Sequence, residues 1–545
     1  MSIYDQDADK AQQQLDKISP SMCYAKWSQV SMHLTNGMTH SCYHPPTHKV
    51  PLEELEKNIT ALHNTEEKKE QRRLMLKGER PEGCSYCWNI EDQGDRSDRI
   101  YRSGEYWAQE SRQDILDAGA SGNINPRYVE VNFNQACNFK CSYCSPHLST
   151  AWQEEIDEHG EYPTVAPHNN VDSLRNKNLM PLKVAQDENP YVTAFWKWWP
   201  DMYKTLRVFR MTGGEPLMDK NTFKVMEYVL DNPNKDLELS ITTNMCPVND
   251  VLFDRFIGLL KQLDNVEHSA EVYVPDPYDG TDWQTWDHYI IGADAKRYHD
   301  SELPSIEREE IKQTFLQIGQ CEEQGDNSYT YEYKYNDKAY HNFSVFVSLD
   351  GWGQQAEYIR HGMDFDKVWN NVNRFLDETH HTSINFINTF NCLSLPSLRE
   401  FLEGVLELRK KWNKSVQYAL GWETPEQRIW FDIPLLRNPA WQSIQILPDD
   451  YQDYLIEAIQ FMEQNKANEE FVDYEGFKDF EIEKVKRNLE HMKKELSKDK
   501  LLRDRADFSK FFSEHDRRRN TDFLATFPEM SQFWFMCEEA EAIYE

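Results

Sequence analysis

The chain has 545 residues, enough for roughly two or three domains with a large buried core. Hydrophobic residues make up 39% of the sequence and aromatic residues 13%, which is typical of a globular protein and excludes an intrinsically disordered chain. The 93 acidic and 60 basic residues give a net charge of −33. Because such a charge repels phosphate backbones, the composition disfavours broad nucleic-acid binding.

The sequence has no apolar run long enough to cross a membrane, so we expect no membrane partner. Its first residues, MSIYDQDADKAQQQLDK, are polar and acidic and do not resemble a signal peptide. We therefore expect a cytoplasmic, reducing location. There the eleven cysteines should be free, catalytic or metal-bound, and not paired in disulfides.

The first predicted elements lie in an N-terminal domain, residues 1–120. Residues 27–33 (WSQVSMH) predict a short strand. Asn36 and Gly37 follow, and then MTHSCYH, which together predict a β-hairpin because both turn residues accept positive φ. Residues 51–77 are expected to form one helix, which the segment GERPEGC ends with its glycines and proline.

From residue 127 onward, predicted strands alternate with predicted helices. The strands are 127–133, 206–211, 237–243, 343–349, 383–390 and 428–433, and the helices are 221–230, 251–263, 366–378 and 398–412. This α/β alternation predicts a parallel sheet with crossover helices over residues 127–450. Because functional residues of such sheets gather at the carboxyl ends of the strands, we expect the loops after the first four strands to face one mouth.

Two segments do not follow the alternation. Residues 266–341 are acidic and aromatic where a short loop is expected, which predicts an inserted subdomain. Residues 451–545 are highly charged and helical in pattern, which predicts a C-terminal helical extension that caps the sheet. Within this extension, the arginine run 517–519 is expected on a solvated face.

Three cysteines directly follow the first strand of the alternating region. The segment NQACNFKCSYCSP, residues 134–146, places Cys137, Cys141 and Cys144 at C-x3-C-x2-C spacing. Thiolates suit soft metals and iron–sulfur clusters, and three of them on a [4Fe–4S] cluster leave one iron open to a small molecule. A zinc knuckle or three unrelated thiols would be the alternatives.

This motif resembles the signature of radical S-adenosylmethionine (SAM) enzymes, with Tyr143 at the aromatic position before the last cysteine. The resemblance implies a partial (β/α)6 barrel and a [4Fe–4S] cluster whose open iron binds SAM. It implies reductive cleavage of SAM to methionine and a 5′-deoxyadenosyl radical, which abstracts a hydrogen atom from the substrate. It also implies an external electron donor such as flavodoxin or ferredoxin.

The resemblance extends to the loops after the later strands. In the family, a glycine-rich loop like TGGEP (residues 212–216) meets the methionine amino group of SAM. Residues at later strand ends would contact the ribose hydroxyls and the SAM carboxylate, and Tyr143 would lie against the adenine ring. The residues expected to bind SAM are Tyr143, Gly213, Gly214, Glu215, Pro216, Asn244, Ser348, Asp350 and Arg360. For the last four, ordinary turn, cap or surface roles are the alternative.

Four further cysteines lie upstream of this motif. Cys23, Gly37 and Cys42 have the form C-x13-G-x4-C, and Cys84 and Cys87 supply a later C-x2-C. Four thiolates can close a cluster or a zinc site fully. The pattern resembles the auxiliary-cluster domains called SPASM and, more closely, their shortened form, twitch, although those domains usually follow the barrel. The resemblance implies a second, auxiliary [4Fe–4S] cluster that relays electrons, with zinc as the alternative.

These observations favour a radical SAM enzyme that acts on a peptide or a small molecule. Peptide modification is common among relatives with such auxiliary domains, while a methyltransferase or a dehydrogenase of small molecules stays open. The alternative is a binding protein that carries two zinc knuckles on an α/β scaffold. Metal content separates the two readings, because iron–sulfur clusters are brown and zinc is colourless.

Overall fold

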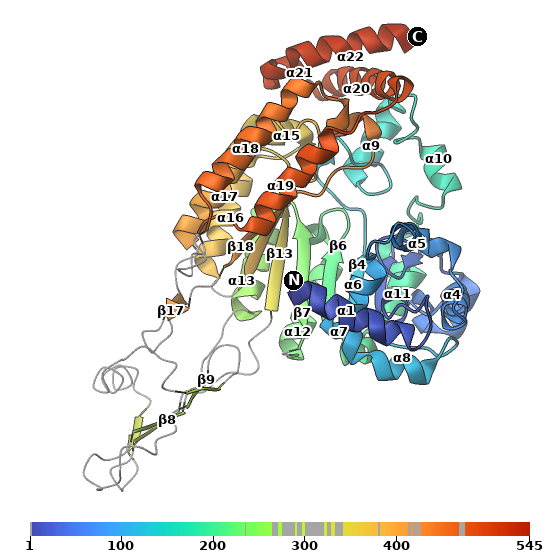
Figure 1. Ribbon diagram of the computed structural model, residues 1–545, viewed down its shortest axis with the longest axis vertical. Helices are drawn as coiled ribbons and strands as arrows, with labels where there is room; N and C mark the ends of the chain where they lie inside the picture. Colours follow the sequence, from blue (N-terminus) through green and yellow to red (C-terminus); the bar gives the residue numbers. More distant parts are fainter. Residues whose placement is uncertain are drawn as a thin grey trace.

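The computed structural model describes residues 3–234, 236–263, 271–274, 289–291, 297–299, 321–323, 329–332, 342–379, 382–412, 416–417, 423–424, 427–467 and 475–544 (Figure 1). At its centre is a nine-stranded sheet with the order β18-β15-β13-β7-β6-β4-β1-β2-β3. Every neighbouring pair from β18 to β1 is parallel, which confirms the predicted parallel sheet.

The six predicted strands and the four predicted helices are present within a few residues of their expected ends. The strands are β4 (Tyr128–Asn132), β6 (Val208–Thr212), β7 (Glu238–Thr243), β13 (Asn342–Ser348), β15 (Ser383–Ile387) and β18 (Ile429–Asp432). The helices are α12 (Lys220–Asp231), α13 (Asp250–Leu263), α16 (Phe365–Glu378) and α17 (Leu398–Trp412). In α16, apolar residues recur at helical spacing and are buried on one face, which packs toward the sheet.

Three short strands near the N-terminus extend the same sheet. Strand β1 (Gln29–His33) pairs antiparallel with β2 (Met38–His40), which in turn pairs with β3 (His48–Lys49). Gly37 takes φ +68° in the turn, and a Cβ there would lie 2.1 Å from the Tyr191 ring. On its other side β1 pairs in parallel with β4, with His33 opposite Asn132. The hairpin therefore lies directly beside the strand that leads into the cysteine motif.

The prediction of a single helix over residues 51–77 is wrong. The structure has α3 (Leu52–Lys57), a 3₁₀ turn (Ile59–Leu62) and α4 (Glu66–Leu76) in its place. The Asn58 side chain accepts a hydrogen bond from the Thr60 N–H, and the Thr65 hydroxyl accepts one from the Lys68 N–H. Both residues therefore act as N-caps that start new helical segments, and they break the longer helix into pieces.

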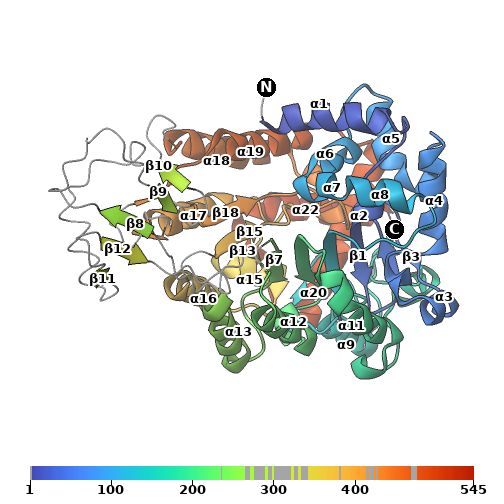
Figure 2. The ribbon, with the colours of Figure 1, turned by 90° about the horizontal axis from the view of Figure 1, so that it is seen from below.

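The two irregular segments have different outcomes. The predicted subdomain 266–341 stays a prediction, because it lies outside the described residues apart from five short strands. These are β8 (Glu271–Val274), β9 (Tyr289–Ile291), β10 (Arg297–His299), β11 (Cys321–Glu323) and β12 (Tyr329–Glu332). The C-terminal extension is helical, with α18 (Gln452–Gln464), α19 (Asp479–Met492), α20 (Lys498–Arg519) and α22 (Ser531–Tyr544). Helices α18 and α19 lie side by side (Figures 1 and 2), and α20 packs against α22. None of the described helices is long and apolar enough to span a bilayer.

Candidate functional site

The cysteine loop, residues 134–146, begins just after β4 and is held by hydrogen bonds on both sides. The Thr150 hydroxyl, at the start of α9 (Thr150–His159), bonds the backbone of Cys137, and the Trp152 indole N–H donates to the Cys141 carbonyl over 2.9 Å. Across the loop, β5 (Lys140–Cys141) pairs with β14 (Arg360–His361). These contacts order the loop without using any of the three thiols.

The three thiols of the loop lie within electrostatic reach of one another. Burial raises the pKa of Cys137 to about 12, and the neighbouring Cys141 thiol adds to the shift. Burial also raises the pKa of Cys144, with further contributions from Cys141 and Cys137. A metal centre that binds all three as thiolates would relieve this repulsion, so the donor set fits a thiolate-ligated cluster. In the described residues no three His, Cys, Asp or Glu side chains are arranged to hold a single metal ion.

Asp350, Arg360 and Tyr143 form a buried network against the middle cysteine. The Arg360 Nε lies 2.7 Å from Asp350 Oδ2, and the Tyr143 hydroxyl donates to the same oxygen over 2.6 Å. One Arg360 Nη lies 3.5 Å from Cys141 Sγ. Burial raises the pKa of the Cys141 thiol, and the Arg360 guanidinium opposes that rise. The structure thus brings these three predicted residues together, and their expected contacts with SAM stay predictions.

The glycine loop, residues 212–216, lies against the cysteine loop. The Glu215 N–H donates to the Ala136 carbonyl over 2.6 Å, and the Gly214 N–H donates to the Asn134 carbonyl over 3.3 Å. A Cβ at Gly214 would lie 2.3 Å from the Ala136 carbonyl oxygen, and Gly213 has φ +133°. Only glycine allows this close backbone approach, which explains the residue type at both positions.

Gly214→Ala should displace the cysteine loop, because its methyl group would collide with backbone and not with a flexible side chain. We expect a loss of about 1–3 kcal/mol of unfolding free energy and reduced iron uptake by the cysteine loop. Gly258→Ala in α13 is the matched control, since a Cβ there meets nothing within 4 Å. Denaturant unfolding and iron analysis of both variants test this, and a stable G214A variant with full iron content would contradict it.

The Glu215 carboxylate joins the ends of β6 and β7. One oxygen accepts from the Thr243 hydroxyl over 2.7 Å and from the Leu217 N–H over 2.9 Å, and the other accepts from the Asn244 N–H over 2.7 Å. Pro216 follows as the first residue of a short 3₁₀ turn. Burial raises the pKa of Glu215 to about 7, although these hydrogen bonds lower it.

The raised pKa of Glu215 makes a prediction about stability. Between about pH 4.5 and 7 the folded protein keeps a proton that the unfolded chain releases, so stability should fall as the pH rises through this window, by about 3 kcal/mol. Glu215→Gln should flatten that slope, whatever its effect on absolute stability. Denaturant unfolding of the metal-free protein across the window tests this, and equal slopes for both proteins would refute it.

The last two predicted strand-end residues differ in their surroundings. The Asn244 side chain donates to Asn138 Oδ1 over 3.1 Å and accepts from the Cys246 N–H over 2.8 Å. It therefore ties the loop after β7 to the cysteine loop. Ser348 ends β13 half-buried, and its hydroxyl has no hydrogen bond within the described part of the chain.

The upstream cysteines gather at a second place. Cys23, Cys42, Cys84 and Cys87 all line one cavity, together with Lys26, His44, Asp98, Arg99 and Arg102 among others. Burial raises the pKa of Cys23 to about 12, and the three other thiols of the group add to this. Four thiols from separate chain segments thus line one cavity beside several cations, and four thiols are the donor set of a fully ligated iron–sulfur cluster.

The histidines near this cavity bind other groups. His44 lies 2.6 Å from Asp98 and stacks on Tyr86, and His48 contacts the Thr65 hydroxyl at 2.9 Å. His33 and His40 are stacked, with their Nε2 atoms 3.3 Å apart. Of the four, only His44 lines the cavity, so four cysteines remain the better ligand set.

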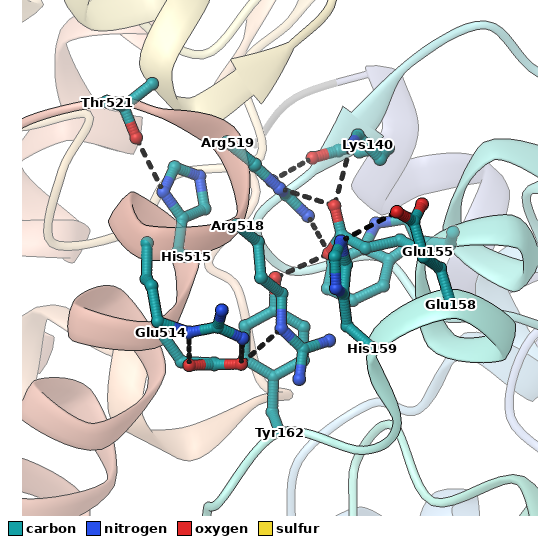
Figure 3. Close-up of polar contacts among 12 residues, drawn as sticks. Lys140, Glu155, Glu158, His159, Tyr162, Glu514, His515, Arg518, Arg519 and Thr521 are labelled. Atoms are coloured by element: carbon teal, nitrogen blue, oxygen red, sulfur yellow. Dashed lines mark hydrogen bonds and ion pairs between the residues drawn. The ribbon is translucent and has the colours of Figure 1, made fainter.

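The C-terminal extension contributes residues to the site that the sequence did not reveal. The solvated face expected for residues 517–519 is wrong for two of the three arginines, because the Arg518 and Arg519 side chains are buried. Arg519 reaches Glu155 of α9 and the backbone of the cysteine loop (Figure 3). Only the arginine run itself marked this segment, and nothing local showed which side chain turns inward.

Comparison with known proteins agrees with the motifs. The chain matches no protein-family model. It is 27% identical over 117 residues to the GTP 3′,8-cyclase of Sulfurimonas denitrificans, covering 22% of this chain and 27% of the cyclase. It is 28% identical over 145 residues to the GTP 3′,8-cyclase of Campylobacter jejuni, covering 26% of this chain and 36% of the cyclase. The similarity therefore spans about a third or less of the length of these relatives.

Among solved structures, Streptococcus suis SuiB aligns with 74% of this chain and 63% of its own, with a TM-score of 0.32 and 10% identity. The cysteine motif after β4, the glycine loop packed against it and the similarity to the cyclases all agree with the resemblance to the radical SAM superfamily.

Proposed function

We propose that the protein cleaves SAM reductively at Cys137, Cys141 and Cys144 and abstracts a hydrogen atom from its substrate. The observation that carries this proposal is the convergence on one loop of three electrostatically coupled thiols, the glycine loop and a buried arginine. A [4Fe–4S] cluster, when bound there, supplies the electron for the cleavage and an open iron for SAM.

The residues around the cysteine loop hold the thiols and shape the space beside them. Arg360 places its charge against the middle thiol, which favours the thiolate form and therefore metal binding. Asp350 fixes that guanidinium and the Tyr143 ring in one arrangement. Gly213 and Gly214 keep side chains out of the contact between the two loops, and the free hydroxyl of Ser348 is available to a ligand at the same strand edge.

We propose that the upstream cysteines bind an auxiliary [4Fe–4S] cluster that relays electrons. Four thiols around one cavity leave no open ligand position, which favours electron transfer over direct substrate binding. Lys26, Arg99 and Arg102 line the same cavity and would offset the negative charge of four thiolates. Four thiolates around a zinc ion would need the same nearby positive charges, so metal analysis is required to distinguish zinc from iron at this site.

A peptide or a small molecule is the proposed substrate, in the cytoplasm, with an external electron donor such as flavodoxin or ferredoxin. The net charge of −33 disfavours a nucleic-acid backbone. The curated relatives act on GTP by name, but they match this chain over about a third or less of their length. This partial similarity therefore does not indicate GTP as the substrate of this protein.

The test is anaerobic reconstitution followed by iron and sulfide analysis and EPR of the reduced protein with and without SAM. About eight irons per chain and one SAM-sensitive signal would support both clusters. About four irons with a SAM-sensitive signal would keep the enzyme and assign the upstream cysteines to zinc. Zinc without iron would refute the proposal and leave a zinc-binding protein.

A further inference from the structure

At the C-terminal end of α20, the buried Arg519 contacts the backbone of the cysteine loop (Figure 3). Arg519 Nη1 donates to the Lys140 carbonyl over 2.7 Å, and Lys140 directly precedes Cys141. The other guanidinium nitrogens lie 3.0 and 3.1 Å from the two carboxylate oxygens of Glu155. The Arg519 side chain is fully buried, so this contact joins the C-terminal extension to the cluster-binding segment out of water.

Glu155 holds two cations at once. Lys140 Nζ lies 2.6 Å from one of its oxygens, and the Tyr162 hydroxyl donates to the other over 2.6 Å. Burial by itself would raise the pKa of Glu155, but Arg519 and Lys140 lower it to about 2. With Glu155 ionised, the two cations and one anion leave a net charge of +1 behind the cysteine loop.

The three consecutive arginines of α20 have different roles. Arg517 is 61% exposed and pairs with Glu514 on its own helix. Arg518 also pairs with Glu514 and donates to the Gly160 and Glu161 carbonyls that follow α9. Arg519 alone reaches the cysteine loop, so its neighbour Arg517 provides a control of the same residue type on the same helix.

We propose that Arg519 is a positioning residue for the cysteine site. Arg519 fixes the backbone next to Cys141 and contributes positive charge near the cysteine loop. This inference rests on the proposed cluster at Cys137, Cys141 and Cys144. One-electron reduction of a cluster adds negative charge, and the net positive charge of Arg519, Lys140 and Glu155 nearby stabilises that charge. Arg519 should therefore favour the reduced state of the cluster, in addition to holding the loop.

The test is an EPR-monitored redox titration of the SAM-sensitive cluster in the full-length protein, with dithionite as reductant. Arg519→Met removes a positive charge and should shift the midpoint potential to more negative values. Glu155→Gln removes a negative charge and should shift it to more positive values. Arg517→Met should leave it unchanged, and Arg519→Lys, which keeps the charge, should restore most of the shift caused by R519M.

Opposite shifts of the midpoint potential in R519M and E155Q would support the inference. A loosened cysteine loop alone would instead shift the potentials of both variants in the same direction. Unchanged potentials, or shifts of the same sign, would overturn it while leaving the proposed function intact. If R519M does not fold, E155Q and R519K decide, since a positive shift in E155Q alone is the expected pattern. A wild-type protein without any SAM-sensitive signal would instead overturn the proposed function and this inference with it.

Discussion

Cys141→Ala is expected to abolish SAM cleavage and to remove about four of about eight irons per chain. Cys141 is buried, with 9% of its surface exposed, and it contacts Arg360. Two remaining cysteines cannot hold a cluster firmly, and the buried Arg360 loses a partner at the same time. Measurement of 5′-deoxyadenosine and methionine after reduction, together with iron analysis, tests the expectation.

Cys392→Ala is the matched control for this experiment. Cys392 is fully buried and belongs to neither cysteine group, so its loss should reduce packing but not iron content. Full SAM cleavage in C141A would show that the cysteine loop is not the catalytic site. Equal iron loss in C392A would show that the effect follows from damage to the fold.

Cys84→Ala is expected to remove the auxiliary iron and to leave SAM cleavage intact. Cys84 lines the cavity of the upstream cysteines, whose apolar surroundings form a hydrophobic cluster separate from the one that contains Cys141. The variant should retain about four irons and an EPR signal that shifts with SAM. Turnover of the true substrate should fall, because the relay is lost.

The contrast with C141A is the decisive part of the second experiment. If C84A also loses the SAM-sensitive signal, the two cysteine groups do not form independent sites. If C84A keeps all of its iron, the upstream cysteines do not hold a cluster, and zinc analysis of the wild-type protein would then decide their role.

Local sequence pattern was sufficient for the strands of the parallel sheet. In β13, β-branched and aromatic residues are concentrated in one short run that Asp350 and Gly351 follow, so both the strand and its end could be predicted from the sequence. The prediction of one helix over 51–77 failed because the charged segments LEELEK and EEKKEQRRLML both suit a helix, whereas NITALHNT between them carries the caps Asn58 and Thr65.

Contacts between distant segments could not be predicted in the same way. β1 pairs with β4 although their paired residues are about a hundred positions apart, and Arg519 bonds the Lys140 carbonyl across 379 positions. In the site, the motif identified the three cysteines and placed Asp350 and Arg360 near them. It could not show that those two pair with each other, because that choice depends on tertiary packing around Tyr143.

The pairing of β1 with β4 has a practical consequence for work with shortened chains. Removing residues 1–120 would leave β4 at the border of the sheet, with the backbone N–H and C=O groups that face β1 unpaired and Val129 and Val131 beside them. An exposed edge strand of this kind can pair with strands of other chains, which leads to aggregation. Since the cysteine loop directly follows β4, we expect a truncated protein to bind less iron even though Cys137, Cys141 and Cys144 are present.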